Sequence, residues 1–203
     1  MQIENKSGQI ENFFSESELT RIQTLFKHPS LIDTGGEGQA KTTGLDQKNV
    51  FYPLFDKLFF KKLQMTFGKN LKLVWAMWCD SHEPFDLHTD KEKHQQSGLP
   101  GKPWISFLVP FSVDHDITKT NLANTIIFNE HDICQPCTPN ALDIFETHCS
   151  HASKNRLACV TLQKKIDWNR GSVIWWHSLL VHGSGHFLNF STKQMVVIHT
   201  YIV

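Results

Sequence analysis

The hydrophobic period of the chain changes at Gly68, and this change constrains the fold more than any other feature. Before Gly68, apolar residues recur at helical spacing. After it, they alternate or form short apolar runs, which is typical of β-strands. Two helices followed by many short strands predict an α+β chain that is mainly β. The expected architecture is an antiparallel two-sheet roll with the helices packed on one sheet.

The first expected helix begins after Ser15. Ser15 and Glu18, three residues apart, form the pattern of a capping box, in which each residue satisfies a backbone N–H of the other. One helical face then carries Leu19, Ile22, Leu25 and Phe26. This spacing predicts an amphipathic helix whose apolar side packs on the sheet.

The second expected helix has Pro53 in its first turn and ends at Gly68. Proline is tolerated in a first turn and glycine is common just past a helix end, so both residues fit these positions. The predicted apolar stripe consists of Leu54, Phe55, Leu58, Phe59 and Leu63.

Strands are expected throughout the second part of the chain. Residues 71–78 form an apolar run, and residues 105–113 alternate, which predicts a half-buried strand. Pro110 within that strand indicates an edge position or a bulge. Further short strands are expected at 124–129, 157–166, 172–176, 179–182 and 193–203. Residues 131–155 form a long irregular segment, and loops of that length are often functional.

The composition describes a soluble globular chain. Hydrophobic residues make up 40% of the 203 positions, and 20 basic residues balance 20 acidic ones. We therefore expect one domain over 1–203, with helices at about 15–68 packed on a core at about 71–203. No nucleic-acid or membrane partner is indicated, and the oligomeric state is left open. Five cysteines and no apolar signal segment predict free thiols and a cytoplasmic location.

A histidine and an aspartate stand one residue apart in the segment PFDLHTDKEKH, as His88 and Asp90. Such a short pair is often only a surface contact. A second histidine, His182, follows a predicted strand near the C-terminus and precedes a glycine-rich turn. Two histidines and one carboxylate can form a facial triad, which holds Fe(II) and leaves coordination positions open.

These residues and their order resemble the Fe(II)/2-oxoglutarate-dependent dioxygenases, especially the phytanoyl-CoA-hydroxylase-like and prolyl-hydroxylase-like branches. The family pattern is His-x-Asp, a distal His and a basic residue about ten positions later, which matches His88, Asp90, His182 and Lys193. The segments VWAMWCDSHEPFDLHTD and GSVIWWHSLLVHGSG are similar to the family's signatures. The resemblance spans nearly the whole chain except the insert between Asn129 and Arg156. It implies a double-stranded β-helix core, also called a jelly roll, as in the cupins.

The resemblance also implies the ligands and their contacts. His88, Asp90 and His182 would hold Fe(II), with 2-oxoglutarate as co-substrate and O2 as oxidant. Lys193 would pair with the distal carboxylate of 2-oxoglutarate, where a cation offsets a buried charge. Ser191 is expected to add a hydrogen bond. Trp78 stands where relatives can have a tyrosine that lines the co-substrate pocket, so its indole is expected to donate there.

The implied reaction is hydroxylation of a C–H bond with release of succinate and CO2. The carboxylate ligand Asp90 favours hydroxylation over halogenation, because related halogenases have a small residue at that position. The substrate is left open among small metabolites, lipid-derived molecules and peptides. Two alternatives remain: a cupin-like metalloenzyme that does not use 2-oxoglutarate, and a non-catalytic jelly-roll binding module stabilised by a metal.

Other histidines and cysteines have simpler interpretations. Residues Cys134, Cys137, Cys149 and His151 offer two close pairs of zinc ligands, although the second pair is tighter than usual and a reduced cysteine-rich loop is the alternative. The histidines near the C-terminal motif are expected to be turn or surface residues: His177, His186 and His199. Trp175 and Trp176 are neighbours in a predicted strand and should face opposite sides.

Overall fold

The computed structural model describes residues 6–28, 31–33, 40–68, 70–90, 105–131, 160–187 and 189–202. Within these residues, two antiparallel sheets are formed. The larger sheet has the order β1 (Ser7–Ile10), β8 (Val173–His177), β5 (Ile105–Val113), β10 (Lys193–Ile202), β4 (Leu71–Ser81), β3 (Ala40–Leu45) and β2 (Ile32–Asp33). The smaller sheet has the order β7 (Leu162–Asp167), β6 (Asn124–Phe128) and β9 (His182–Ser184).

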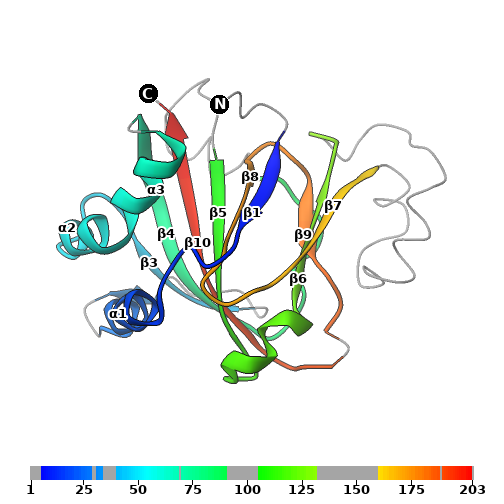
Figure 1. Cartoon of the computed structure of the whole chain (residues 1–203), viewed down its shortest axis with the longest axis horizontal. Helices are drawn as coiled ribbons and strands as arrows, with labels where there is room; N and C mark the ends of the chain where they lie inside the picture. The colour runs from blue at the N-terminus through cyan, green and yellow to red at the C-terminus, as the bar shows by residue number, and fades with distance from the viewer. Residues whose placement is uncertain are drawn as a thin grey trace.

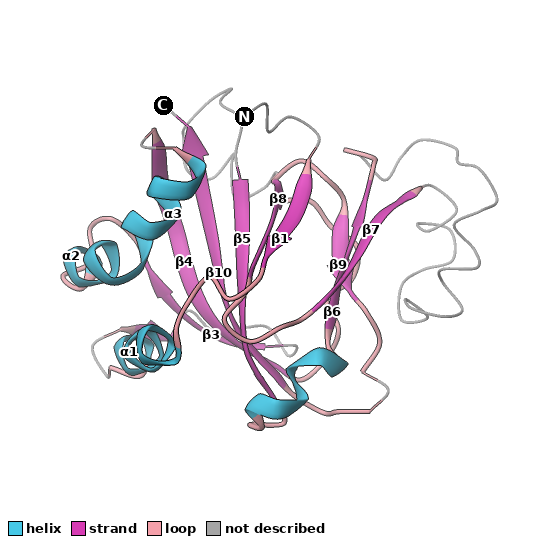
Figure 2. Ribbon diagram, in the orientation of Figure 1, coloured by secondary structure: helices cyan, strands magenta, loops and turns pink. Residues whose placement is uncertain are grey.

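The helices and the smaller sheet lie on opposite sides of the larger sheet (Figure 1). Figure 2 shows the same arrangement by secondary structure, with the short 3-10 helix η2 (Ile117–Leu122) between β5 and β6. This arrangement confirms the prediction of a mainly β, two-sheet roll with helices on one sheet. None of the helices in the described ranges is long and apolar enough to span a membrane.

The first helix, α1 (Glu16–Phe26), begins as the sequence predicts. The Ser15 side chain accepts from the Glu18 backbone N–H, and the Ser15 N–H donates to the Glu18 carboxylate at 2.8 Å. Both halves of the capping box are therefore present. The predicted apolar face is buried as a whole, at Leu19, Ile22, Leu25 and Phe26.

The second helix contains a π-helical segment that the sequence pattern did not predict. It runs as α2 (Tyr52–Phe55), the π segment η1 (Asp56–Phe60) and α3 (Lys61–Phe67), and Gly68 ends it with φ 123°. A π turn shifts the phase of the helix, so the adjacent residues Phe59 and Phe60 are both buried. The expected stripe was wrong at Leu54, which is 44% exposed.

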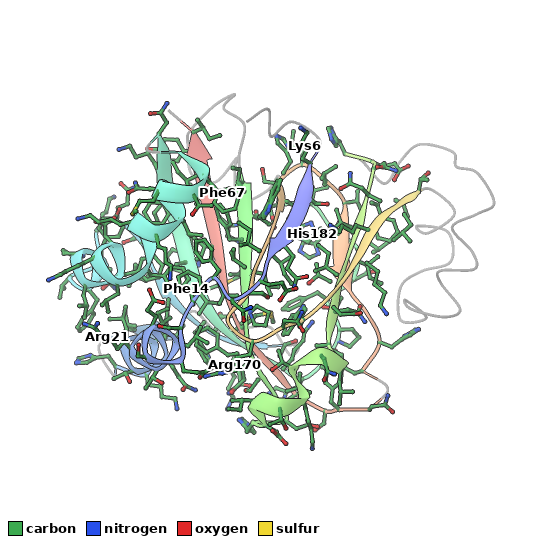
Figure 3. The ribbon with its side chains drawn as sticks, viewed as in Figure 1. Lys6, Phe14, Arg21, Phe67, Arg170 and His182 are labelled. Carbon is green, nitrogen blue, oxygen red and sulfur yellow. The ribbon has the colours of Figure 1, made fainter. Side chains whose placement is uncertain are left out.

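An aromatic core fills the space between the helices and the larger sheet. Phe59 stacks on Phe14 with ring centroids 4.3 Å apart, and Trp78 meets Phe111 edge-on at 4.7 Å. Phe14 and Phe67 mark this side of the sheet in Figure 3. Burial of each such ring contributes about 1.5–3 kcal/mol, so this cluster anchors the helices to the sheet.

Strand β5 is confirmed over 105–113, but the expectation of a half-buried strand was wrong. All nine residues are buried, because β5 lies inside the larger sheet between β8 and β10. Phe107 faces the helix-side core and Leu108 faces the smaller sheet. The register with β10 shifts next to Pro110, so the predicted bulge is confirmed and the edge position is not.

Several strand limits differ from the sequence pattern. Strand β4 continues to Ser81, and β9 begins at His182, where the pattern placed a strand end. Strands β1, β2 and β3 were not predicted, because their short or polar sequences carry no apolar alternation. The predicted cysteine and histidine zinc ligands lie outside the described residues, so that site stays a prediction.

Candidate metal centre and co-substrate site

The three predicted metal ligands converge between the two sheets. One ligand atom from each of His88, Asp90 and His182 lies within 4.8 Å of the others. His182 is the first residue of β9 and lies between the sheets in Figure 3. His88 and Asp90 lie in a loop that follows β4, outside the named strands. The structure therefore brings the predicted triad together from two segments, this loop and the start of β9.

Backbone hydrogen bonds place the His88–Asp90 loop against the β9 end. His88 and His182 form an isolated antiparallel bridge, with N–H···O distances of 3.0 and 2.9 Å. The Asp90 N–H donates to the Ser178 carbonyl at 3.0 Å. The positions of all three ligands are thus fixed by main-chain contacts.

Both imidazoles direct the same nitrogen toward the centre. Nδ1 of His88 lies 2.7 Å from the Asp86 carbonyl oxygen, and Nδ1 of His182 lies 2.9 Å from the Leu180 carbonyl oxygen. A carbonyl oxygen only accepts, so each Nδ1 carries the proton and donates. An Nδ1–H that donates to a backbone carbonyl is the usual second contact of a metal-binding histidine, and it leaves Nε2 of each ring as the atom that could bind a metal.

Asp90 is a buried carboxylate whose two oxygens differ. Oδ2 accepts from Ser106 Oγ at 2.5 Å and from Trp176 Nε1 at 3.2 Å, whereas Oδ1 lies 3.7 Å from His182 Nε2. Burial opposes its ionisation, but nearby imidazoles and the Ser106 hydroxyl outweigh burial and hold the pKa of Asp90 at about 2. Burial lowers the pKa of His182 to about 4. At neutral pH the centre offers one carboxylate and neutral imidazole, which suits Fe(II).

Lys193, the first residue of β10, is almost completely buried, with 2% of its surface exposed. Its Nζ donates to the Ser184 hydroxyl. Three aromatic rings surround Nζ at 5.0–5.5 Å: Phe85, Trp168 and Phe187. Burial lowers the pKa of Lys193 to about 7, and the nearby Cys79 opposes this shift.

Nothing in the described ranges pairs a carboxylate with Lys193 Nζ. A buried ammonium group without an anion is costly, and most buried cations have one. Ser184 follows His182 by two positions in β9, so both face the same side of that strand about 6–7 Å apart. The arrangement could accept an anion beside the candidate metal ligands.

Two predicted co-substrate contacts are not at this site. Ser191 precedes β10, is exposed, and its hydroxyl and N–H donate to the Asp114 carboxylate at 3.0 and 2.8 Å. Ser184 holds the place beside Lys193 instead. Trp78 packs in the helix-side core, because alternate residues of β4 face opposite sides and its neighbour Cys79 faces the smaller sheet.

Three further residues contact the centre, and the sequence reasoning did not select them: Ser106, Trp176 and His199. His199 was expected to be a turn or surface residue, yet it lies within β10 and is 2% exposed. His177 begins a turn, as expected, because its carbonyl accepts from the Leu180 N–H, but its side chain is buried. Trp176 faces the smaller sheet while Trp175 faces the helix-side core, as predicted. The period of two along β10, counted from Lys193, would have placed His199 on the side of the centre.

Comparison with protein-family models and with curated proteins gives no match. Solved structures do match. The non-heme alpha ketoglutarate dependent carbocyclase SnoK from nogalamycin biosynthesis superposes with a TM-score of 0.61 at 12% identity, covering 97% of this chain and 79% of that one. EctD from S. alaskensis in its apoform gives 0.58 at 15% identity, covering 97% and 72%. HygX from Streptomyces hygroscopicus, with nickel and 2-oxoglutarate bound, gives 0.56 at 12% identity, covering 97% and 83%.

The similarity extends over almost the whole described fold, although the sequences have diverged widely. The chain therefore has the double-stranded β-helix fold found in 2-oxoglutarate-dependent oxygenases. The fold class predicted from the sequence is confirmed.

Proposed function

We propose that this chain is an Fe(II)- and 2-oxoglutarate-dependent oxygenase. His88, Asp90 and His182 would hold the metal through Nε2, Oδ1 and Nε2, because these are the atoms left available by the surrounding hydrogen bonds. Two imidazoles and one carboxylate leave coordination positions for a co-substrate and oxygen. The proposal takes residues 1–203 as one catalytic domain, since the helices pack directly on the sheet that carries the site.

We propose 2-oxoglutarate as the co-substrate because Lys193 is a buried cation beside the metal ligands. This dicarboxylate would place one end at the metal and its distal carboxylate between Lys193 Nζ and the Ser184 hydroxyl. The anion would supply the missing partner of a buried ammonium group, and the aromatic rings around Nζ would keep water away from the pair. Neither alternative explains why a lysine would be buried here. These alternatives are a cupin-like enzyme that does not use 2-oxoglutarate and a metal-stabilised binding module.

When bound, the metal supplies the oxidation: 2-oxoglutarate and O2 become succinate and CO2, and one oxygen atom enters a substrate C–H bond. Lys193 and Ser184 would orient the co-substrate, and the Nδ1 hydrogen bonds of His88 and His182 leave both Nε2 atoms to hold the metal. The chemistry requires no side-chain general base, and we assign none. Because Asp90 fills the third ligand place, we propose hydroxylation rather than halogenation.

We propose a small-molecule substrate. The similar structures include a carbocyclase, an epimerase and a complex with 5-hydroxyectoine, and each of these concerns a small molecule. An outcome other than hydroxylation would use the same metal and co-substrate contacts in this chain.

Calorimetric titration of 2-oxoglutarate into the anaerobic Fe(II) protein tests the proposal. We expect one binding site, slow formation of succinate in air, and a Kd that rises at least about tenfold in Lys193→Ala, because a lost charge-assisted contact costs about 1.5–3 kcal/mol. Lys164→Ala is the matched control, since Lys164 lies exposed on β7. Tight metal binding without any 2-oxoglutarate binding would favour the cupin-like alternative, and binding of neither would refute the proposal.

A further inference from the structure

We propose that Ser106, Trp176 and His199 are positioning residues that make Asp90 offer a single oxygen to the metal. This inference rests on the proposed metal centre and assigns a role to three buried side chains that the reaction itself does not use. None of the three is a ligand. They act on Oδ2 of the carboxylate, whereas Oδ1 is the oxygen nearer His182 Nε2.

The three side chains form a row across three neighbouring strands of the larger sheet. Ser106 of β5 stands directly opposite Trp176 of β8 on one side and His199 of β10 on the other. Their exposed fractions are 0%, 2% and 2%. Directly opposite residues in a sheet have side chains on the same face, so the row forms a continuous polar strip beneath Asp90.

The strip fills the hydrogen-bonding capacity of one carboxylate oxygen. Asp90 Oδ2 accepts from the Ser106 hydroxyl at 2.5 Å and from the Trp176 indole at 3.2 Å. A hydroxyl and an indole N–H can both donate to a carboxylate, and donors in the protein interior cannot be exchanged for water. Oδ1 remains on the side of His182 Nε2, 3.7 Å away. The carboxylate therefore cannot rotate to offer both oxygens without breaking two buried hydrogen bonds.

His199 fixes the direction of the Ser106 hydroxyl. The hydroxyl has one proton, which it donates to Asp90, so its lone pair accepts from His199 Nδ1 at 3.2 Å. Nδ1 also lies 3.8 Å from Asp90 Oδ2. Trp176 has a second contact, because its ring lies 4.6 Å from the ring of His182. The same strip thus orients the carboxylate and supports one imidazole.

If Asp90 gave both oxygens, it would fill a coordination position that co-substrate or oxygen needs. The strip would therefore keep that position open, as well as strengthen metal binding. Residues that orient a metal ligand in this way typically change metal affinity about 10- to 100-fold when removed.

Co(II) is the probe, because its visible absorption spectrum reports coordination number and needs no turnover. The variants are Ser106→Ala, Trp176→Phe and both together, titrated with Co(II) in the metal-free full-length protein. We expect the Kd for Co(II) to rise about 10- to 100-fold in the double variant and less in each single one. We also expect the spectrum of the double variant to show a changed coordination geometry, which a merely structural role would not produce.

Two control variants match the chemistry of the change but lie away from the strip. Ser112→Ala removes a buried hydroxyl of the same strand that donates to Gln194, and Trp175→Phe changes the neighbouring indole on the helix side. Both should keep the parent's Kd and spectrum. Unfolding midpoints measured by circular dichroism show whether each variant folds. If the double variant does not fold, the Kd and spectra of the single variants test the positioning role.

The possible outcomes separate the inference from the proposed function. A parent protein that binds no Co(II) would refute the metal centre and this inference with it. A parent that binds Co(II), with folded variants whose Kd and spectrum match it, would overturn the positioning role and leave the metal centre standing. The positioning role would also be overturned if Kd rose in the strip variants and rose by the same factor in both control variants.

Discussion

The two faces of the larger sheet differ in the chemistry of the side chains that they bury. The helix side holds a large apolar cluster rich in aromatic rings, in which Phe59 stacks on both Phe14 and Phe55. The side toward the smaller sheet mixes apolar residues with buried polar groups, including Asp90 and Lys193. Apolar contacts need no specific partners, whereas each buried polar group needs one. The first face therefore contributes mainly to stability, and the second carries the buried polar groups that the proposed binding site requires.

Even adjacent residues of one strand belong to different faces of the larger sheet. Trp175 and Trp176 are neighbours in β8, yet one packs against Phe67 and the other donates to Asp90. The same residue type serves stability on one face and ligand placement on the other. Substitutions on the two faces should therefore have separable effects on metal binding and on the free energy of unfolding.

The largest separable effect is expected for His182→Ala. Loss of one of three metal ligands should abolish measurable Fe(II) binding and succinate formation, while the unfolding midpoint of the metal-free protein changes little. Its backbone bridge to His88 does not need the side chain. Metal analysis and thermal unfolding of the same sample test both parts, with His82→Ala as the exposed control. Fe(II) binding as tight as the parent's would mean that the triad is not the metal site.

The opposite pattern, a loss of stability with unchanged metal binding, is expected for Phe59→Ala on the helix side. Phe59 is fully buried and stacks on Phe14 and Phe55, so its truncation should lower the free energy of unfolding by about 3–5 kcal/mol. The Kd for Fe(II) of the protein that remains folded should be unchanged. Urea unfolding measures the first quantity, and Met65→Ala, at an 85% exposed position, should change it by less than about 0.5 kcal/mol. Weakened metal binding in folded Phe59→Ala would show that the two faces are coupled.

A smaller effect, dependent on pH, is expected from Lys193. Its pKa is about 7 in the folded protein, below its ordinary value of 10.5, because burial disfavours the charge. Between these values the unfolded chain binds a proton that the folded chain does not. The free energy of unfolding should therefore rise with pH above about pH 7, by up to about 1.4 kcal/mol per unit, relative to Lys193→Met.

Urea unfolding of metal-free parent and Lys193→Met protein at about pH 6 and about pH 9 measures this difference. Below about pH 7 the two proteins should differ by a constant amount, because Lys193 is then protonated in both states. Lys164→Met, at the surface of β7, should show no pH-dependent difference. A difference that is constant or falls from about pH 6 to about pH 9 would mean that Lys193 stays protonated when buried.

Sequence periodicity predicts the apolar face well because burial repeats with the local structure. The capping box at Ser15, the apolar face of α1 and the opposite orientations of Trp175 and Trp176 all follow from period and residue type. The π segment at 56–60 does not, because it changes the helical phase through an inserted turn that no single residue type signals. The strands β2 and β3 at one end of the larger sheet also escape prediction, since backbone pairing of β3 with β4 and of β2 with β3 forms them.

Some residues of the candidate site can likewise be predicted from the sequence, and others cannot. His88, Asp90 and His182 can be selected from residue type and order, and Lys193 from its place in the family pattern that the sequence resembles. Contacts between distant segments do not: Ser184 rather than Ser191 reaches Lys193, because Ser191 lies before β10 and bonds to Asp114. The contact of Ser106 with Asp90 depends on strand order, which places β5 between β8 and β10.

The backbone bridge between His88 and His182 has a consequence for the entropy of the chain. The two residues are 94 positions apart (182 − 88), and joining the ends of a flexible loop of that length costs about 4 kcal/mol, apart from a constant term. Sheet pairing and the packing of the β-roll meet this cost during folding. A metal ion that arrives later does not have to close the loop, so the free energy of coordination appears as affinity for the ion. The metal ligands are thus brought together when the chain folds, before the metal ion binds.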